Sequence, residues 1–188
     1  ESSLATADLL EQIDQRISRL NNFGRTEPTL CEFLENRLAP VYNYSRMEMR
    51  KGFKAQNWDE RATLLPASQT LSPSDFGFHN AIRRNNGEIV FIDFEYFGWD
   101  DPIRVTSDFV LHPGMKLDAA ARHRYLRGSI ELYDSDPGFR YRLKLLFPLV
   151  AVRWCLIMLN EFLPEFRKRR DLLGSRNSQK LVKRRQLK

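Results

Sequence analysis

The sequence is poor in the residues that build cross-linked or metal-held folds. Its 188 residues include only two cysteines and three histidines. Cys31 and Cys155 are far apart and each lies in an apolar segment, so we expect free thiols in a reducing compartment, with a single disulfide as the alternative. No paired Cys/His spacing predicts a zinc site, and His79, His112 and His123 offer no triad spacing.

Long uninterrupted hydrophobic runs are also missing. The most apolar segment, 145–163, is broken by Pro148, Arg153 and Glu161, so we expect a core helix and no transmembrane segment. No secretory signal precedes the first helical pattern. With no signal and no membrane segment expected, we predict a soluble, cytoplasmic protein. The chain starts at Glu1 without a methionine, which favours a processed product or a fragment of a longer protein.

Net positive charge is absent from most of the chain and concentrated at its end. The net charge is +6, yet residues 164–188 hold ten Lys/Arg against two acidic residues. No aromatic side chains interleave with these basic residues, and no nucleic-acid motif is present, so nucleic-acid binding is not expected. We predict a solvated basic helix or tail over 166–188, with contact to an anionic partner as the alternative.

Helical periodicity accounts for the two ends of the chain. Apolar residues at helical spacing predict a first helix from a cap at Thr6 to a stop at Gly24. A second helix is expected over about 29–38, ended by Pro40. Residues 41–70 predict one or two helices and then a loop.

The C-terminal third is predicted to be helical as well. Asp101-Pro102 is typical of an N-cap followed by a first-turn proline. Asp118 and Asp136-Pro137 predict two further helix starts, the last helix bending at Pro148. The fold class is therefore mainly α with a small β-hairpin, an α+β arrangement.

The hairpin is expected in the middle of the chain. Residues 81–85 and 88–92 predict two strands around Asn86-Gly87, a strong two-residue turn signal. With this turn, Asn80 lies opposite Asp93, and opposed residues project to the same face about 4.5–5.5 Å apart. An amide oxygen beside a carboxylate suits Mg²⁺, although a slip of one residue would remove the pairing.

Asp75 is the second acid of interest. It precedes Asn80 by five residues, and this Asp-x-x-x-x-Asn loop is followed by a hairpin and then by Asp93. Phosphoryl-transfer sites use this order, with the first acid as base and the second on the metal. The alternative, in which Asp75-Phe76-Gly77 is the metal motif, lacks a suitable loop and hairpin upstream. Asp75 is therefore the candidate base.

Three segments carry a family resemblance. They are SDFGFHN at 74–80, IDFE at 92–95 and GWDDP at 98–102. Together they resemble the catalytic core of the aminoglycoside phosphotransferase and choline kinase-like family, whose members carry His-Gly-Asp-x-x-x-x-Asn, a hairpin, Ile-Asp-Phe-Glu and Gly-x-x-Asp-Pro. The resemblance implies the C-terminal lobe of a protein-kinase-like fold over 1–165, with a catalytic core at 71–115.

The resemblance also implies a reaction and its residues. Asp75 matches the catalytic aspartate, Asn80 and Asp93 match the magnesium ligands, and Glu95 matches an acid near the phosphates of ATP. The implied activity is transfer of the γ-phosphoryl group of ATP to the hydroxyl group of a small-molecule substrate.

The sequence departs from the family pattern in three respects. Pro73 replaces the family's histidine, and Asp108 follows Asp101-Pro102 at a longer interval than usual. No segment before Asp75 resembles the smaller nucleotide-binding lobe with its lysine, so that lobe is expected to be missing from this chain. These departures favour, as the alternative, a kinase-like binding module without catalytic activity.

Overall fold

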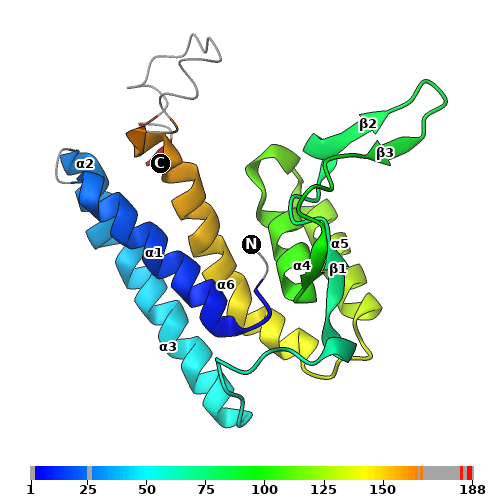
Figure 1. Cartoon of the computed structure of the whole chain (residues 1–188), viewed down its shortest axis with the longest axis horizontal. Helices are drawn as coiled ribbons and strands as arrows, with labels where there is room; N and C mark the ends of the chain where they lie inside the picture. Colours follow the sequence, from blue (N-terminus) through cyan, green and yellow to red (C-terminus); the bar gives the residue numbers. More distant parts are fainter. Residues whose placement is uncertain (1–2, 25–26, 165, 167–182, 184–185, 188) are drawn as a thin grey trace.

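The computed structural model describes residues 3–24, 27–164, 166, 183 and 186–187. These residues form a mostly helical fold with two small antiparallel sheets, which confirms the predicted α+β class. Figure 1 shows α1, α3 and α6 side by side, α4 and α5 on the other side of α6, and a hairpin of β2 and β3 that projects from the body. The longer helices are α1 (Thr6–Gly24), α3 (Ala39–Ala55), α4 (Pro102–Leu111), α5 (Ala119–Leu132) and α6 (Phe139–Met158).

The first helix follows its predicted bounds. It begins at Thr6, so Ala5 rather than Thr6 is the cap position, and the backbone N–H of Ala5 donates to the Asp8 carboxylate at 3.0 Å. This reciprocal bond satisfies a donor at the helix start. The predicted apolar positions form part of the core, and the buried ones are Leu9, Leu10, Ile13 and Leu20.

The predicted stop at Pro40 is wrong. Helix α2 (Pro28–Phe33) continues through a π-helical turn, Leu34–Leu38, directly into α3. Pro40 lies in the first turn of α3, where a missing N–H costs little, because the α-helical hydrogen-bonding pattern is already interrupted by the π-turn. Proline there marks a change of helix type and not an end.

Helix α6 is the central element of the described fold. It contacts α1, α3 and α4, and residues such as Leu149, Val150 and Leu156 are fully buried. Pro148 lies inside the helix. The span 139–162 is the one described helix that is long and apolar enough to cross a membrane, and its buried side chains are those expected of a core helix.

The hairpin is real, but its predicted register is wrong. Strands β2 (Ala81–Arg83) and β3 (Ile89–Phe91) pair Ala81 with Phe91, and the N–H of Ile92 donates to the Asn80 carbonyl at 2.9 Å. Asn80 therefore lies opposite Ile92 and not Asp93. The cause is a three-residue loop, 85–87, in which Gly87 adopts φ +88°. Type I turns with a left-handed third residue close such loops.

A second sheet was not predicted. Strand β1 (Thr70–Ser72) pairs with β4 (Gly98–Asp100), placing Leu71 opposite Trp99. This pairing brings both ends of the segment 70–100 together beside α4.

The acidic caps of the C-terminal third lie where helices begin, with one shift. Asp101 accepts a bond from the Ile103 N–H at 3.0 Å, and Asp118 caps α5. Asp136 accepts from the N–H of Gly138, but α6 starts only at Phe139, so Gly138 is its cap residue.

Candidate functional site

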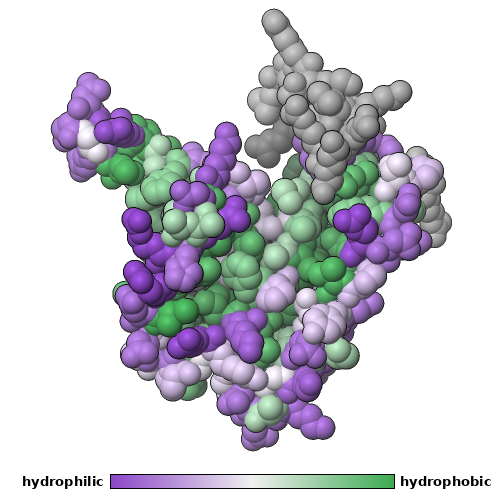
Figure 2. Space-filling view, turned by 180° about the vertical axis from the view of Figure 1, so that it is seen from behind, coloured by the Kyte–Doolittle hydropathy of each residue, from purple (hydrophilic) through white to green (hydrophobic). Residues whose placement is uncertain are grey.

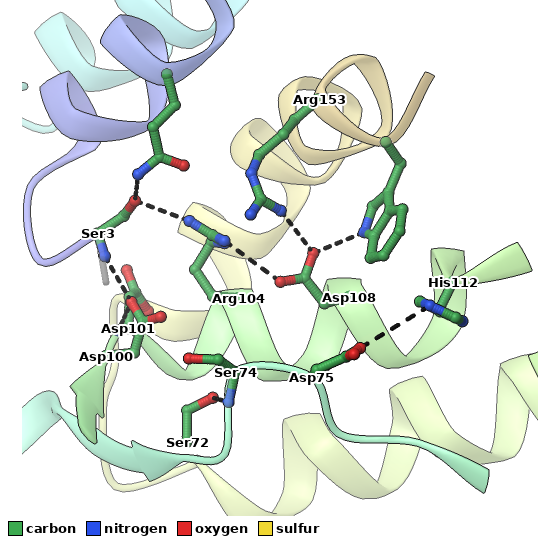
Figure 3. Close-up of polar contacts among 12 residues, drawn as sticks. Ser3, Ser72, Ser74, Asp75, Asp100, Asp101, Arg104, Asp108, His112 and Arg153 are labelled. Atoms are coloured by element: carbon green, nitrogen blue, oxygen red, sulfur yellow. Dashed lines mark hydrogen bonds and ion pairs between the residues drawn. The ribbon is translucent and has the colours of Figure 1, made fainter. Parts of the chain in front are cut away.

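Asp75 lies at the centre of the candidate site. It follows β1 on an exposed loop, and its carboxylate is 52% exposed. The ring nitrogen Nε2 of His79 lies 2.9 Å from Asp75 Oδ1, and that of His112 lies 3.9 Å from the same oxygen. Figure 3 shows Asp75 and His112 facing each other across the end of α4. The carboxylate of the candidate base is therefore accessible, with His79 at hydrogen-bond distance and His112 further away.

The two imidazole rings lie face to face. Their centroids are 3.8 Å apart with an interplanar angle of 9°, and Trp154 packs edge-on against His112. The backbone N–H of Gly114 donates to Nδ1 of His112 at 3.1 Å. Nδ1 therefore carries a lone pair, and the neutral ring has its proton on Nε2, directed toward Asp75.

Asp75, His79 and His112 are a group whose ligand atoms lie within 4.8 Å of one another. A metal shared by two histidines needs their lone pairs to converge, because they occupy different corners of the coordination sphere. Parallel stacked rings direct their lone pairs side by side, and Nε2 of His112 is protonated. The arrangement therefore fits a hydrogen-bonded carboxylate better than a transition-metal centre.

The environment of His112 favours its neutral form. Burial is the main cause of the lowered pKa of His112, and the neighbouring His79 adds to it. The carboxylates of Asp75 and Asp108 oppose the effect. The neutral form of His112 is therefore favoured, and its Nε2 lies 3.9 Å from Asp75 Oδ1, beyond hydrogen-bond distance.

Asn80 and Asp93 are near neighbours without being paired. The side-chain amide of Asn80 donates to the backbone carbonyl of Asp75 at 2.9 Å, which closes the loop between these two residues. A second bond, from the backbone N–H of Ile92 to the carbonyl of Asn80, connects the end of this loop to the residue before Asp93. The predicted pairing across the hairpin is absent: Asp75 and Asn80 share one hydrogen-bonded loop, and Asp93 follows the residue that is bonded to Asn80.

The backbone is strained at both candidate acids. Ser74, directly before Asp75, has φ +63°, and Asp93 itself has φ +67°. Left-handed conformations are costly for residues other than glycine, and they concentrate at functional sites. Two of the four such non-glycine residues in the described chain thus flank or form the predicted site.

Aromatic rings fix the hairpin to the helices below it. Phe76 packs against Phe91 of β3 in a tilted arrangement, with 4.6 Å between centroids, and stacks on Phe109 of α4 at 5.6 Å. Phe109 in turn stacks on Tyr125 of α5 at 4.0 Å. Offset contacts of this kind add about 0.5–1.5 kcal/mol each to the area that they bury. These ring contacts fix the position of Phe76, the residue that follows Asp75.

Asp108, in α4, accepts hydrogen bonds from three side chains. Its carboxylate accepts from Trp154 at 2.7 Å and from Arg104 and Arg153 at 3.4 Å (Figure 3). Burial, together with the charge of Arg104, lowers the pKa of Arg153 to about 10. Arg104 also donates to the hydroxyl of Ser3. Asp108 therefore has a structural environment, joining α4 to α6.

Glu95 and Asp93 are both exposed, and within the described residues neither carboxylate has a hydrogen-bond or ion-pair partner. Sequence reasoning missed the histidines, because His79 and His112 are separated in sequence and meet only through the fold. A signal was present: His79 lies four residues after Asp75, and His112 ends the helix that Asp101 begins.

No family model, no curated protein and no solved structure matches this chain.

The predicted tail, 166–188, lies almost wholly outside the described residues. Lys183 is described, and it forms an ion pair with Glu27 while lying over the ring of Phe162 at 5.0 Å.

Proposed function

We propose that this chain is the larger lobe of an ATP-dependent phosphotransferase that moves the γ-phosphoryl group to a hydroxyl group of a small molecule. The observation that carries the proposal is the pair of hydrogen bonds that joins Asp75 to Asn80 and Asn80 to the residue before Asp93. The order of these residues matches that of phosphoryl-transfer sites. The strained backbone at Ser74 and Asp93 supports the same conclusion.

Asp75 is the proposed base. Its exposed carboxylate has one oxygen, Oδ1, held by His79, which leaves Oδ2 to orient a hydroxyl group and to accept its proton. A general base must reach the proton directly, and an exposed loop allows a substrate to approach. His79 and His112 act as positioning residues for this carboxylate.

The proposed magnesium ligands have the chemistry that Mg²⁺ prefers. Asn80 uses its amide nitrogen to bind Asp75, so its side-chain oxygen has no donor among the described residues. The carboxylate of Asp93 is exposed and has no hydrogen-bond or ion-pair partner among the described residues. These oxygen atoms fit a hard cation shared with phosphates, and Glu95 lies two residues further on the same segment. When bound, Mg²⁺ neutralises charge on the transferred phosphoryl group.

The proposal includes a nucleotide-binding partner lobe and a cytoplasmic location. Members of the family that the sequence resembles phosphorylate aminoglycosides, choline, ethanolamine and sugars, and we expect the acceptor to belong to one of these classes. None of the described elements resembles a glycine-rich loop over phosphates, so the partner lobe is expected to supply it.

A non-catalytic binding module is the second candidate. Two observations favour it: His79 already occupies one oxygen of Asp75, and Asn80 lies opposite Ile92 rather than Asp93. Pro73 in place of the family's histidine points the same way. This candidate predicts a protein that retains its fold but transfers no phosphate.

The test uses the full-length gene product, with ATP as donor and a panel of the acceptor alcohols named above. We expect Asp75→Asn to lower kcat by roughly 10²–10⁴-fold, because a positioned base contributes that much, while Mg-ATP affinity stays within about twofold. Asp93→Asn should abolish Mg²⁺-dependent ATP binding, measured by calorimetry. Asp134→Asn, at an exposed acid after α5, is the matched control.

The outcomes separate the two candidates. Wild-type Mg-ATP affinity in Asp93→Asn would disprove the metal assignment. If the wild-type protein neither binds Mg-ATP nor transfers phosphate to any acceptor, the binding module is the better description.

A further inference from the structure

A cavity of about 590 Å³ lies at the opposite end of α4 from Asp75. Its walls come from the start of α1, the turn after α3 and the start of α6, and Asp101, the cap of α4, reaches its floor. His112 caps the other end of this ten-residue helix, so the cavity is roughly 15 Å from the candidate base at 1.5 Å per residue. The proposed phosphotransfer site does not use it.

The cavity is held open by backbone bonds. The N–H of Leu64 donates to the carbonyl of Leu4 at 2.8 Å, and the N–H of Ala7 donates to the carbonyl of Glu60 at 2.7 Å. These two bonds fasten the loop after α3 to the start of α1. The volume is within the range of small-molecule sites, which are usually formed before the ligand arrives.

The walls are apolar and aromatic. Trp58 lies between Phe53 and Tyr141 with ring centroids 5.5 and 5.8 Å away, both in edge-on geometry, so its position is fixed by packing. Leu64 and Leu65 line the cavity beside it. An apolar body of one or two rings matches this lining.

The charged groups of the floor are already paired with one another. Arg142 is 8% exposed and donates to Asp136 at 2.9 Å and to Asp101 at 3.3 Å. Asp136 also accepts from the N–H of Gly138, and Asp101 from that of Ile103. An anionic ligand would have to displace one of these carboxylates from Arg142, leaving a buried charge unpaired.

The remaining charge of the lining is negative. Asp59 also lines the cavity, so that the lining holds three carboxylates and one guanidinium, a net charge of two negatives. Asp59 is exposed at the rim, where it accepts the N–H of Arg61.

From these observations we infer that the cavity between α1, α3 and α6 binds a small molecule with an apolar ring system and a protonated amine. The ring system packs among Trp58, Phe53 and Leu64, and the amine faces Asp59. This site is separate from the Asp75 site, and its existence does not depend on phosphotransfer activity.

Three naphthalene probes of equal size test the inference: 1-naphthylmethylamine, 1-naphthalenemethanol and 1-naphthoate. Binding to the whole chain is followed by the indole N–H signal of Trp58 in two-dimensional NMR, assigned with Trp58→Phe. We expect saturable binding of the amine, binding of the alcohol that is weaker by roughly three- to tenfold, and no saturable binding of the carboxylate.

Two exposed leucines supply a matched pair of variants. Leu65, at the cavity, is 71% exposed, and Leu132, at the end of α5, is 72% exposed. Leu65→Lys places an ammonium group at the rim and is expected to weaken amine binding by about tenfold or more, whereas Leu132→Lys leaves it unchanged. Asp59→Asn should weaken binding of the amine by roughly threefold and leave that of the alcohol unaltered.

Three results would overturn the inference. They are no saturable binding of any probe, binding of the carboxylate as tight as that of the amine, and equal effects of the two lysine substitutions. Far-UV circular dichroism of each variant establishes whether the fold is retained, and since Asp59, Leu65 and Leu132 are exposed we expect no change for substitutions at these positions.

Discussion

The helices α1, α3 and α6 bury a continuous apolar core, whereas the segment 70–100 leaves most of its large apolar side chains exposed. Ile13, Met49 and Leu149 in the helices have no exposed surface. Figure 2 shows the contrast in the hairpin, whose tip is hydrophilic and whose stem carries hydrophobic residues on its surface. Among the exposed residues of this segment are Ile82, Ile89, Phe94, Phe97 and Trp99.

The two regions are therefore held by different forces. Burial of apolar area stabilises the helices by about 25 cal/mol per Å². The segment 70–100 depends on short backbone ladders, the aromatic contacts of Phe76 and the bonds around Asp75. Candidate chemistry lies in the second region and most of the stability in the first, a common division between scaffold and loop.

Removing an apolar side chain from each region should give the largest difference in stability between the two regions. Leu149→Ala in α6 should lower the free energy of unfolding by about 2–5 kcal/mol, because it leaves a cavity in a fully buried position. Ile82→Ala in β2, 52% exposed, should change it by no more than about 0.5 kcal/mol. Urea denaturation measures both values. Equal effects would mean that the hairpin stem is buried in solution.

The carboxylates of the two regions should differ in the same way. Asp108→Asn should lower the free energy of unfolding by about 3 kcal/mol, since Arg104 and Arg153 would keep buried charges without a carboxylate. Asp93→Asn, at an exposed acid, should be nearly neutral in stability. Thermal and urea unfolding provide the comparison. A neutral Asp108→Asn would show that solvent reaches the network.

Glycine substitutions test the turn that sets the hairpin register. Gly87→Ala should lower the free energy of unfolding by about 1–2 kcal/mol, because Gly87 has φ +88°, a conformation that is costly for a residue with a Cβ. No neighbouring atom lies within 4 Å of the added carbon, so that a steric clash does not contribute. Gly98→Ala is the control: it also has open space and its φ is not positive. Any difference in unfolding free energy between them is backbone strain. No difference would contradict the three-residue loop.

The pH dependence of stability is expected to give the smallest effect. The pKa of His112 is lower in the folded protein than in the unfolded chain, mainly through burial. The unfolded state therefore binds more protons, and stability that is present above the unfolded pKa is lost as the pH falls through the folded pKa. Unfolding free energies at several pH values between 7 and 5 should fall more steeply for wild type than for His112→Gln. Parallel curves would exclude His112 as a cause.

Much of the helical region could be predicted from the sequence. The spacing of Leu9, Ile13 and Leu20 gave α1, and Asp101 and Asp118 marked two helix starts. Helical periodicity and capping are local, so nearby residues determine them. Pro40 misled the prediction because proline is tolerated in a first helical turn as well as after a helix end.

The candidate site was predicted less completely. The motif located Asp75, Asn80 and Asp93, but the hairpin register depends on whether the loop has two or three residues, and Asn85-Asn86-Gly87 allows both. The pairing of Leu71 with Trp99 was missed because three-residue strands far apart in sequence leave little periodicity. The stacking of His79 on His112 requires α4, the 3₁₀ turn η4 (Pro113–Met115) and the loop that carries Asp75 to be placed together.

The rings beneath the hairpin have a mechanical consequence. Phe76 is bonded to Asp75 through the chain and is gripped between Phe91 of an exposed strand and Phe109 of a buried helix. A displacement of the hairpin stem relative to α4 would therefore change the packing of Phe76, the residue that follows the candidate base Asp75.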